Sequence, residues 1–250
     1  MRARLGCMKH ATIAVICLLG TTLATGQDDM AKAGKASEAY RAHRELITKP
    51  SFGLAKVEAL IKKYKLRDKE EGPLPAAEYK KLSSKEKFSY HMIYGEVSSQ
   101  NCDAMPTFVD EEKHIYAYPP GAFQDERGWS DAQMAEIKRN RNAFLPLLQQ
   151  TILKGKIGCN LKQAILELEA FELIPTMCEV YKRKRYDHDI LSVMMILMKE
   201  GKFKPFLESA SYKKLYADEE SSYQSFLVAN KENQDLIMSR ATAFYASKRK

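Results

Sequence analysis

Long hydrophobic runs are scarce in this 250-residue sequence. The most apolar run, residues 11–24, is 14 residues long, whereas a membrane-spanning helix needs about 20. Three basic residues precede this run, and Ala24-Thr25-Gly26 follows it as a small-x-small cleavage site. This order is typical of a cleavable export signal. The sequence therefore predicts a signal peptide at residues 1–26, export to the periplasm or the cell exterior, and no membrane span.

Cysteine is also sparse, since two of the five cysteines lie inside the predicted signal. The other three are Cys102, Cys159 and Cys178, and an odd number in an oxidising compartment suggests one disulfide and one unpaired thiol. A predicted helix at residues 160–174 separates Cys159 from Cys178. Such a helix rises about 22 Å, too far for these two to bond. We therefore predict a Cys102–Cys159 disulfide between two loops, with Cys178 free and buried.

Motifs of the commoner enzyme classes are missing. There is no glycine-rich phosphate loop, no GxSxG nucleophile elbow and no HExxH zinc motif. A dense basic stripe is missing too, because Lys and Glu are mixed along the chain. Loss of the signal removes three basic residues and lowers the net charge from +8 to +5. This charge pattern argues against a nucleic-acid partner and allows a weak contact with an anionic surface.

Helical periodicity is what the sequence does contain. Apolar residues recur at helical spacing between Leu54 and Tyr64, and capping boxes predict helix starts at Ser83 and Ser130. Asn160 is a third cap signal. Further helices are predicted at residues 28–49, 160–174, 175–185, 203–207, 212–216, 223–227 and 237–244.

The most apolar of these segments is residues 193–198, which is hydrophobic all round. That composition predicts the central buried helix. Asp187 or Asp189 precedes it and is expected to serve as its N-cap, because aspartate oxygens accept hydrogen bonds from free amides at a helix start.

Strand alternation is weak. Residues 107–109 and 115–118 could pair as a small β-hairpin. From residue 130 onward the chain reads as helices on short connectors, which resembles a HEAT-like stack of antiparallel helical hairpins without a repeat of fixed period. The prediction is a mainly α-helical fold: one domain, residues 27–250, organised around a long ordered loop at 98–129. A subdivision into 27–97 and 130–250 is the alternative.

The central loop carries the candidate chemistry. Cys102 could act as a nucleophile, with His91 or His114 as its base and Asp103 adjacent. A disulfide at Cys102 would remove that nucleophile, so a hydrolase is the alternative function. Glu111, Glu112 and His114, like the triplet at 187–189, lack the spacing of recognised zinc or calcium sites. No metal, cofactor or catalytic residue is therefore predicted.

Aromatic residues give the same loop a second interpretation. Tyr116, Tyr118, Phe123 and Trp129 surround a Pro-Pro-Gly turn, and such rings suit sugar or peptide ligands. Alternatively, they pack the loop onto the helices. Glu96, which has no second carboxylate beside it, is assigned to a helix surface. The leading prediction is an exported, soluble binding or scaffold protein of the cell envelope, non-catalytic, with a protein, peptide or glycan as its partner.

Overall fold

The computed structural model describes residues 32–68, 72–98, 107–123, 126–155, 157–218 and 224–249. The predicted export signal, Cys102 and Asp103 lie outside the described residues. From Lys32 onward the chain forms one compact unit. The predicted mainly α-helical fold is confirmed.

Three of the first four helices were predicted, and the short third one, at residues 76–79, was not. Val57 and Ile61 bury the apolar stripe of the second helix. At the start of the fourth helix, Ser83 and Glu86 exchange the two hydrogen bonds of the predicted capping box. The first helix is shorter than predicted. The bounds are α1 (Lys35–Arg44), α2 (Leu54–Lys63), α3 (Ala76–Tyr79) and α4 (Ser84–Ile93).

Five helices form the described middle part of the chain. The capping box of Ser130 and Gln133 is confirmed at the first of them. The last of the five is buried from Asp189 through Met198, which confirms the predicted central helix. The bounds are α5 (Asp131–Arg139), α6 (Arg141–Leu153), α7 (Cys159–Glu167), α8 (Ile174–Lys184) and α9 (Asp189–Glu200).

The described residues of the C-terminal part form two short helices and one long one, α10 (Lys204–Leu207), α11 (Ala210–Tyr216) and α12 (Lys231–Lys248). The prediction of a helix at residues 223–227 is wrong, because Phe226–Val228 forms a strand, β4. The described residues also contain three single-turn 3-10 helices, η1 (Leu66–Asp68), η2 (Glu111–Lys113) and η3 (Phe171–Leu173).

Within the described ranges, two small antiparallel sheets join segments that are distant in sequence. Strand β1 (Val97–Ser98) pairs with β3 (Arg127–Gly128), and β2 (His114–Tyr116) pairs with β4. The predicted strand at 115–118 therefore exists in part, but its partner is β4 rather than residues 107–109. A strand that pairs across the fold leaves no local turn signal, so sequence reading favoured the nearer segment.

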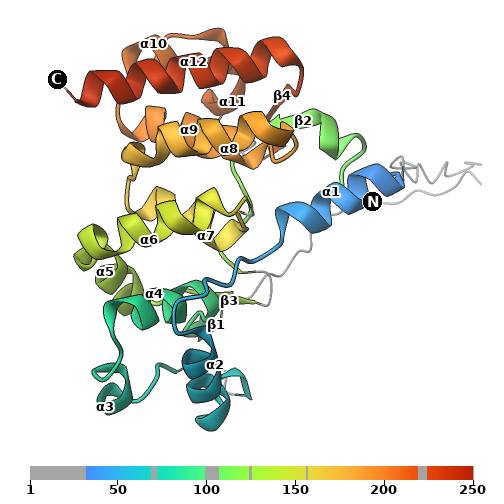
Figure 1. The fold of residues 1–250 in the computed structure, drawn as a ribbon. Coiled ribbons are helices and arrows are strands. Elements are labelled where there is room, and N and C mark those ends of the chain that lie inside the picture. Colours follow the sequence, from blue (N-terminus) through green and yellow to red (C-terminus); the bar gives the residue numbers. More distant parts are fainter. Residues whose placement is uncertain are drawn as a thin grey trace, which may run out of the picture. The chain divides into compact units, whose positions relative to one another are not determined.

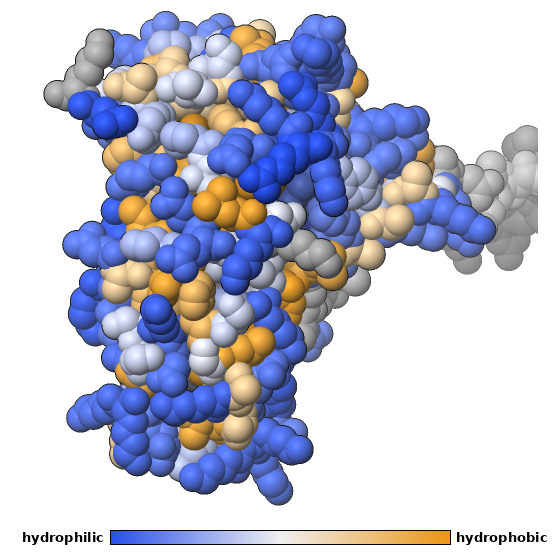
Figure 2. All heavy atoms as spheres, viewed as in Figure 1, coloured by the Kyte–Doolittle hydropathy of each residue, from blue (hydrophilic) through white to orange (hydrophobic). Residues whose placement is uncertain are grey.

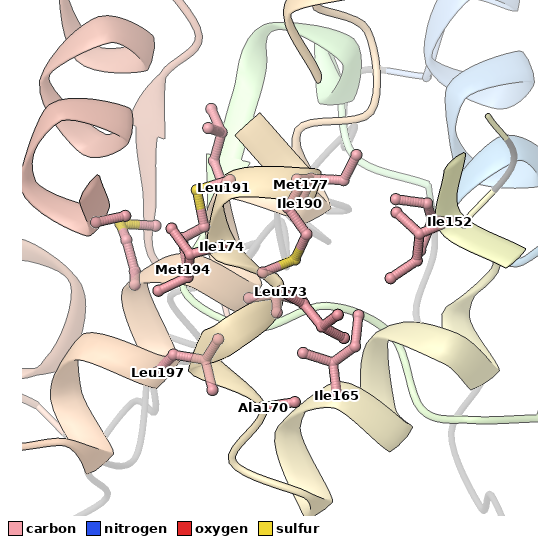
Figure 3. Packing of buried hydrophobic residues seen from close by; sticks show 14 of the residues in the cluster. Ile152, Ile165, Ala170, Leu173, Ile174, Met177, Ile190, Leu191, Met194 and Leu197 are labelled. Carbon is pink, nitrogen blue, oxygen red and sulfur yellow. The ribbon is translucent and has the colours of Figure 1, made fainter. Parts of the chain in front are cut away.

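The helices pack on one another in chain order (Figure 1). Helix α4 packs on α2, α6 and α7 on α4, α8 and α9 on α6 and α7, and α12 on α8 and α9. Figure 3 shows side chains from α6, α7, α8 and α9, such as Ile152, Ile165, Met177 and Met194, filling the space between these helices. A smaller apolar cluster around Val57 and Tyr94 lies between α2 and α4. Helix α4 contributes to both clusters and thus links the N-terminal helices to the main core.

An extended segment, residues 45–52, joins α1 to α2 and lies along the start of α7. Asn160 does not cap α7 as predicted, because Gly158 is the N-cap residue. The side-chain amide of Asn160 instead accepts a hydrogen bond from Thr48 N at 2.9 Å and donates to Thr48 O and Met92 O. A Cβ at position 158 would collide with the backbone of Leu46 and Thr48, so glycine permits this close approach.

Figure 2 shows that hydrophilic residues cover much of one face and that hydrophobic residues occur between them. Apart from the neighbours Leu46 and Ile47, the exposed large apolar side chains, such as Val228 and Leu236, come from separate segments. Single exposed apolar residues are normal on soluble proteins and require no partner.

Candidate ligand pocket beside His91

A pocket of about 450 Å³ lies where α3, the end of α4 and α5 meet. Its walls are mostly apolar, and its few polar groups come from four different segments. The lining residues are Pro73, Leu74, Pro75, Ala76, Tyr79, His91, Glu96, Ala132, Gln133, Ala135, Glu136 and Arg139. A volume of this size and an apolar lining with a few polar groups are common features of small-molecule sites.

Gln133 fixes the geometry at the base of the pocket. Its Oε1 accepts hydrogen bonds from Glu96 N at 2.9 Å and from Ser130 N, and its Nε2 donates to Tyr94 O at 2.9 Å. These bonds determine which end of the amide is the oxygen. The capping box that starts α5 therefore also ties that helix to the segment after α4.

His91 lies on the buried side of α4, with 1 % of its surface exposed. Gln133 Nε2 donates to His91 Nδ1 at 3.3 Å, so the ring proton resides on Nε2, which lies 2.9 Å from Tyr79 Oη. Burial lowers the pKa of His91 to about 4, because the low-dielectric interior disfavours the charged form. The imidazole is neutral at pH 7, and protein groups occupy both of its nitrogens.

Tyr79 connects this histidine to the pocket rim. Its oxygen accepts from His91 Nε2–H, and the Glu136 carboxylate is the nearby charge that most affects its hydroxyl. Burial and the nearby charge of Glu136 raise the pKa of Tyr79 above its ordinary value. Glu136 also pairs with Lys87 at 3.4 Å and with Arg139. Burial opposes its ionisation, but Asn140 and the two cations keep the Glu136 pKa below its ordinary range.

Glu96 differs from Glu136 because its carboxylate has no basic partner. It is 8 % exposed, and among the described residues no Lys, Arg or His forms an ion pair with it. Tyr90 Oη donates to its Oε1 and Ser130 Oγ donates to its Oε2, each at 2.8 Å. Each hydroxyl oxygen in turn accepts a backbone N–H, from Leu74 and Gln133 respectively. The assignment of Glu96 to a helix surface is therefore wrong.

The four predicted ligand-binding rings do not form one exposed surface. Tyr116 and Phe123 are buried, and Tyr118 and Trp129 are partly buried against the main core. Phe123 meets Trp129 edge to face at 5.7 Å, whereas Tyr118 meets Tyr216 at 5.6 Å. The Trp129 indole donates to His91 O at 2.7 Å. This arrangement favours the alternative in which these rings pack the loop onto the helices.

The predicted thiol site is only partly within the described residues. Cys102 and Asp103 lie outside them, so the Cys102–Cys159 pairing and the catalytic alternative stay predictions. His114 stacks on Phe226 at 3.6 Å and contacts Tyr116, so the two candidate histidines lie in different side-chain clusters. No disulfide joins two of the described cysteines, and Cys178 is a buried free thiol.

Cys159 does not lie in a loop, which is where the predicted disulfide placed it. It is the first residue of α7 and is completely buried. Its Sγ lies 3.6 Å from Glu45 O and 3.5 Å from Ala122 O, within reach of a thiol hydrogen bond. The extended segment after α1 and the loop before β3 cover this position.

A second group of buried polar residues lies between α1, η2, α7 and α9. Arg44 donates to Asp189 and, at 2.7 Å, to Glu111. Lys162 pairs with Asp187 at 2.6 Å and with Asp189 at 3.4 Å. Arg41 adds a further pair to Glu111. We refer to these six residues as the α1 ion network: Arg41, Arg44, Glu111, Lys162, Asp187 and Asp189.

The predicted capping role of the aspartates is therefore wrong. His188 is the N-cap residue of α9, and no side chain makes a cap hydrogen bond there. Asp187 and Asp189 instead neutralise Lys162, whose burial opposes its charge while the two carboxylates raise its pKa above the ordinary value. Within the described parts of the chain, no three His, Cys, Asp or Glu residues are grouped as metal ligands.

A second cavity, of about 390 Å³, lies near the end of α2. Four basic residues and two acidic ones line it, together with Ile61 and Ile93. Its charged side chains are exposed, and Lys49 already pairs with Glu58 at 3.0 Å. Solvent screens such charges, so this cavity lacks the fixed, buried polar groups of the pocket beside His91.

Sequence reading missed most of the pocket. His91 was singled out, but as the base for a distant thiol, and Tyr79, Gln133 and Glu136 were not recognised as neighbours. The capping box at Ser130 was the one local signal in this region. Its second role, in which Ser130 and Gln133 also bind Glu96, depends on the packing of α5 against the end of α4.

Among the described residues, no helix combines the length and the hydrophobicity needed to span a membrane. Comparison of the chain with family models, curated proteins and solved structures gives no match.

Proposed function

We propose that this chain is an exported, non-catalytic binding protein that holds a small ligand in the pocket beside His91. The observation that carries the proposal is the pocket itself. It has a volume of about 450 Å³ and apolar walls, and its polar side chains are already fixed by hydrogen bonds to one another. Fixed polar groups reduce the ordering cost of binding, so they favour a site that recognises a ligand without rearrangement.

The protonation states in the pocket support binding over catalysis. A general base at neutral pH needs a pKa near 7 and a free lone pair. His91 has a pKa of about 4, and its basic nitrogen accepts from Gln133. The raised pKa of Tyr79 keeps its proton on the phenol. The hydrolase alternative based on Cys102 gains no support from these residues, because His91 is committed to its partners in the pocket.

Export remains part of the proposal and is tested separately. If residues 1–26 are a cleaved signal, N-terminal sequencing of the native protein should start at or near Gln27. A native chain that retains Met1 would remove the export assignment and leave the pocket proposal standing.

A neutral apolar fluorophore, N-phenyl-1-naphthylamine, tests the pocket directly. Its emission should increase when it enters an apolar cavity. Ala76 lines the pocket and Ala77 does not, although both are exposed on α3. The Ala76→Trp variant should fill the pocket and abolish the increase, whereas Ala77→Trp should retain it. An increase that is equal in both variants, or absent from the unmodified protein, would overturn the proposal.

A further inference from the structure

The buried carboxylate of Glu96 has no basic side chain of the pocket as its partner. A buried carboxylate loses hydration, and proteins normally offset that loss with a basic side chain or a metal ion. Glu96 receives two hydroxyl hydrogen bonds, which are neutral donors. Both oxygens therefore act as acceptors, which is the pattern of an ionised carboxylate.

The remaining charges of the lining do not compensate Glu96. The lining contains two carboxylates and one guanidinium, and that guanidinium, on Arg139, pairs with Glu136. Lys87 also pairs with Glu136, at 3.4 Å. His91 is neutral because burial lowers its pKa. Both cations thus pair with Glu136, and Glu96 is the carboxylate of the lining without an ion-pair partner, in a cavity whose other walls are largely apolar.

We propose that the ligand of this pocket is a small primary amine whose ammonium group binds Glu96. This inference rests on the proposed binding function and specifies its ligand class. A carboxylate has about four lone-pair sites, and the two hydroxyls use two of them. The others can accept the N–H groups of an ammonium ion in charge-assisted hydrogen bonds.

The rest of the pocket suits the body of such a ligand. Pro73, Pro75, Ala76, Ala132 and Ala135 provide apolar walls for a hydrocarbon chain. The hydroxyl donors Tyr90 and Ser130 hold the carboxylate in place, because the backbone N–H groups of Leu74 and Gln133 orient them. Desolvation in this cavity strengthens the attraction between a carboxylate and an ammonium ion relative to water.

Matched aliphatic probes test the inference by ¹H–¹⁵N NMR titration at pH 7. Hexylamine carries an ammonium group at this pH, as lysine does, hexan-1-ol is neutral, and hexanoate is an anion. Each probe's affinity is taken from shifts of the Glu96 and Ala132 amides, which report on the pocket. Hexylamine should bind about tenfold more tightly than hexan-1-ol, and hexanoate more weakly than either.

The Glu96→Gln variant should remove the preference for hexylamine and keep the affinity for hexan-1-ol. Glu78→Gln is the matched control, because Glu78 is a carboxylate on α3 that does not line the pocket. It should retain the preference. Thermal unfolding confirms that each variant is folded, and the comparison of probes on the unmodified protein decides the question even if Glu96→Gln does not fold.

The outcomes separate the two proposals. Equal affinity for hexylamine and hexan-1-ol would overturn the amine proposal and leave the binding pocket intact. Hexanoate binding that is tighter than hexylamine binding would have the same meaning. The absence of pocket shifts with every probe would overturn the amine proposal and count against the binding function as well.

Discussion

The α1 ion network and the pocket beside His91 both bury carboxylates, but they balance the charge differently. In the network, three cations face three carboxylates, and Arg44, Glu111, Lys162 and Asp189 are at most 5 % exposed. In the pocket, Glu96 is buried next to open volume and has hydroxyl partners only. The comparison teaches that pairing, rather than burial, distinguishes a structural charge from one available to a ligand.

The network also has a clear structural task. It attaches α1 to η2, α7 and α9 through side chains as much as 145 residues apart. The guanidinium of Arg44 lies 4.3 Å from the centre of the Tyr116 ring, which adds a cation–π contact. Each charge is thus satisfied within the protein, and the network needs no external partner.

The largest expected effect comes from placing an unpaired charge where there is neither a partner nor a cavity. Met195 is completely buried in α9. Met195→Asp should reduce the free energy of unfolding by more than about 4 kcal/mol or prevent folding, because no cation faces the new carboxylate. Chemical denaturation of Met195→Asp and of the milder Met195→Leu measures the difference. Equal stability of the two variants would contradict the assignment of α9 as the central helix.

Removal of one member of the network should rank next. Lys162→Met leaves Asp187 without its closest cation and Asp189 with Arg44 alone. Loss of one partner of a buried pair costs about 3–5 kcal/mol. The control is Lys231→Met, since the Lys231–Asp235 pair is exposed and solvent screening leaves it little effect on stability. Urea denaturation should give clearly different unfolding free energies for the two variants. Similar losses of unfolding free energy would show that the buried ion pairs stabilise the fold no more than an exposed pair.

The pH dependence of stability tests the neutral state of His91. Its folded pKa, about 4, lies below the ordinary value of 6.5 because burial disfavours the charged ring. The nearby charge of Lys87 lowers the His91 pKa further, whereas the charge of Glu136 raises it. The unfolded chain therefore binds a proton first as the pH falls. The contribution of His91 is fully present above pH 6.5 and decreases by about 3 kcal/mol on acidification to pH 4.

The variant His91→Gln isolates this contribution, because other groups also titrate in that range. The difference in unfolding free energy between the unmodified protein and His91→Gln should decrease as the pH is lowered from 7 to 4. A difference that is independent of pH would place the imidazole in a more hydrated environment than the structure indicates.

The smallest effects are expected from replacing the two serine caps, Ser83 and Ser130, with alanine. Ser83→Ala removes an exposed capping box from α4 and should cost about 1 kcal/mol. Ser130→Ala removes an equivalent cap from α5 and also a donor to the buried Glu96 carboxylate, so it should cost about 2 kcal/mol. Thermal melts of both variants test the order. A larger loss for Ser83→Ala would argue against a structural role for the Glu96 hydrogen bond.

Local signals in the sequence determined where most helices begin and which face they bury. The capping boxes at Ser83 and Ser130 operate between residues three apart, so their physics is contained in a short stretch of chain. The apolar run at 193–198 has the same advantage, because a segment hydrophobic on all sides has to be buried. These features, and with them the mainly α-helical fold, could be predicted without the structure.

Only the tertiary structure decided what the polar side chains do. Asn160, Asp187 and Asp189 resemble helix caps in the sequence, yet their partners are Thr48, Lys162 and Arg44. Glu96 looked like a surface residue until α5 was packed against the end of α4. A hydrogen bond or ion pair between distant segments depends on how helices pack, and that packing leaves no periodic mark in the sequence. For this reason the unpaired carboxylate, and the pocket that contains it, became visible only in three dimensions.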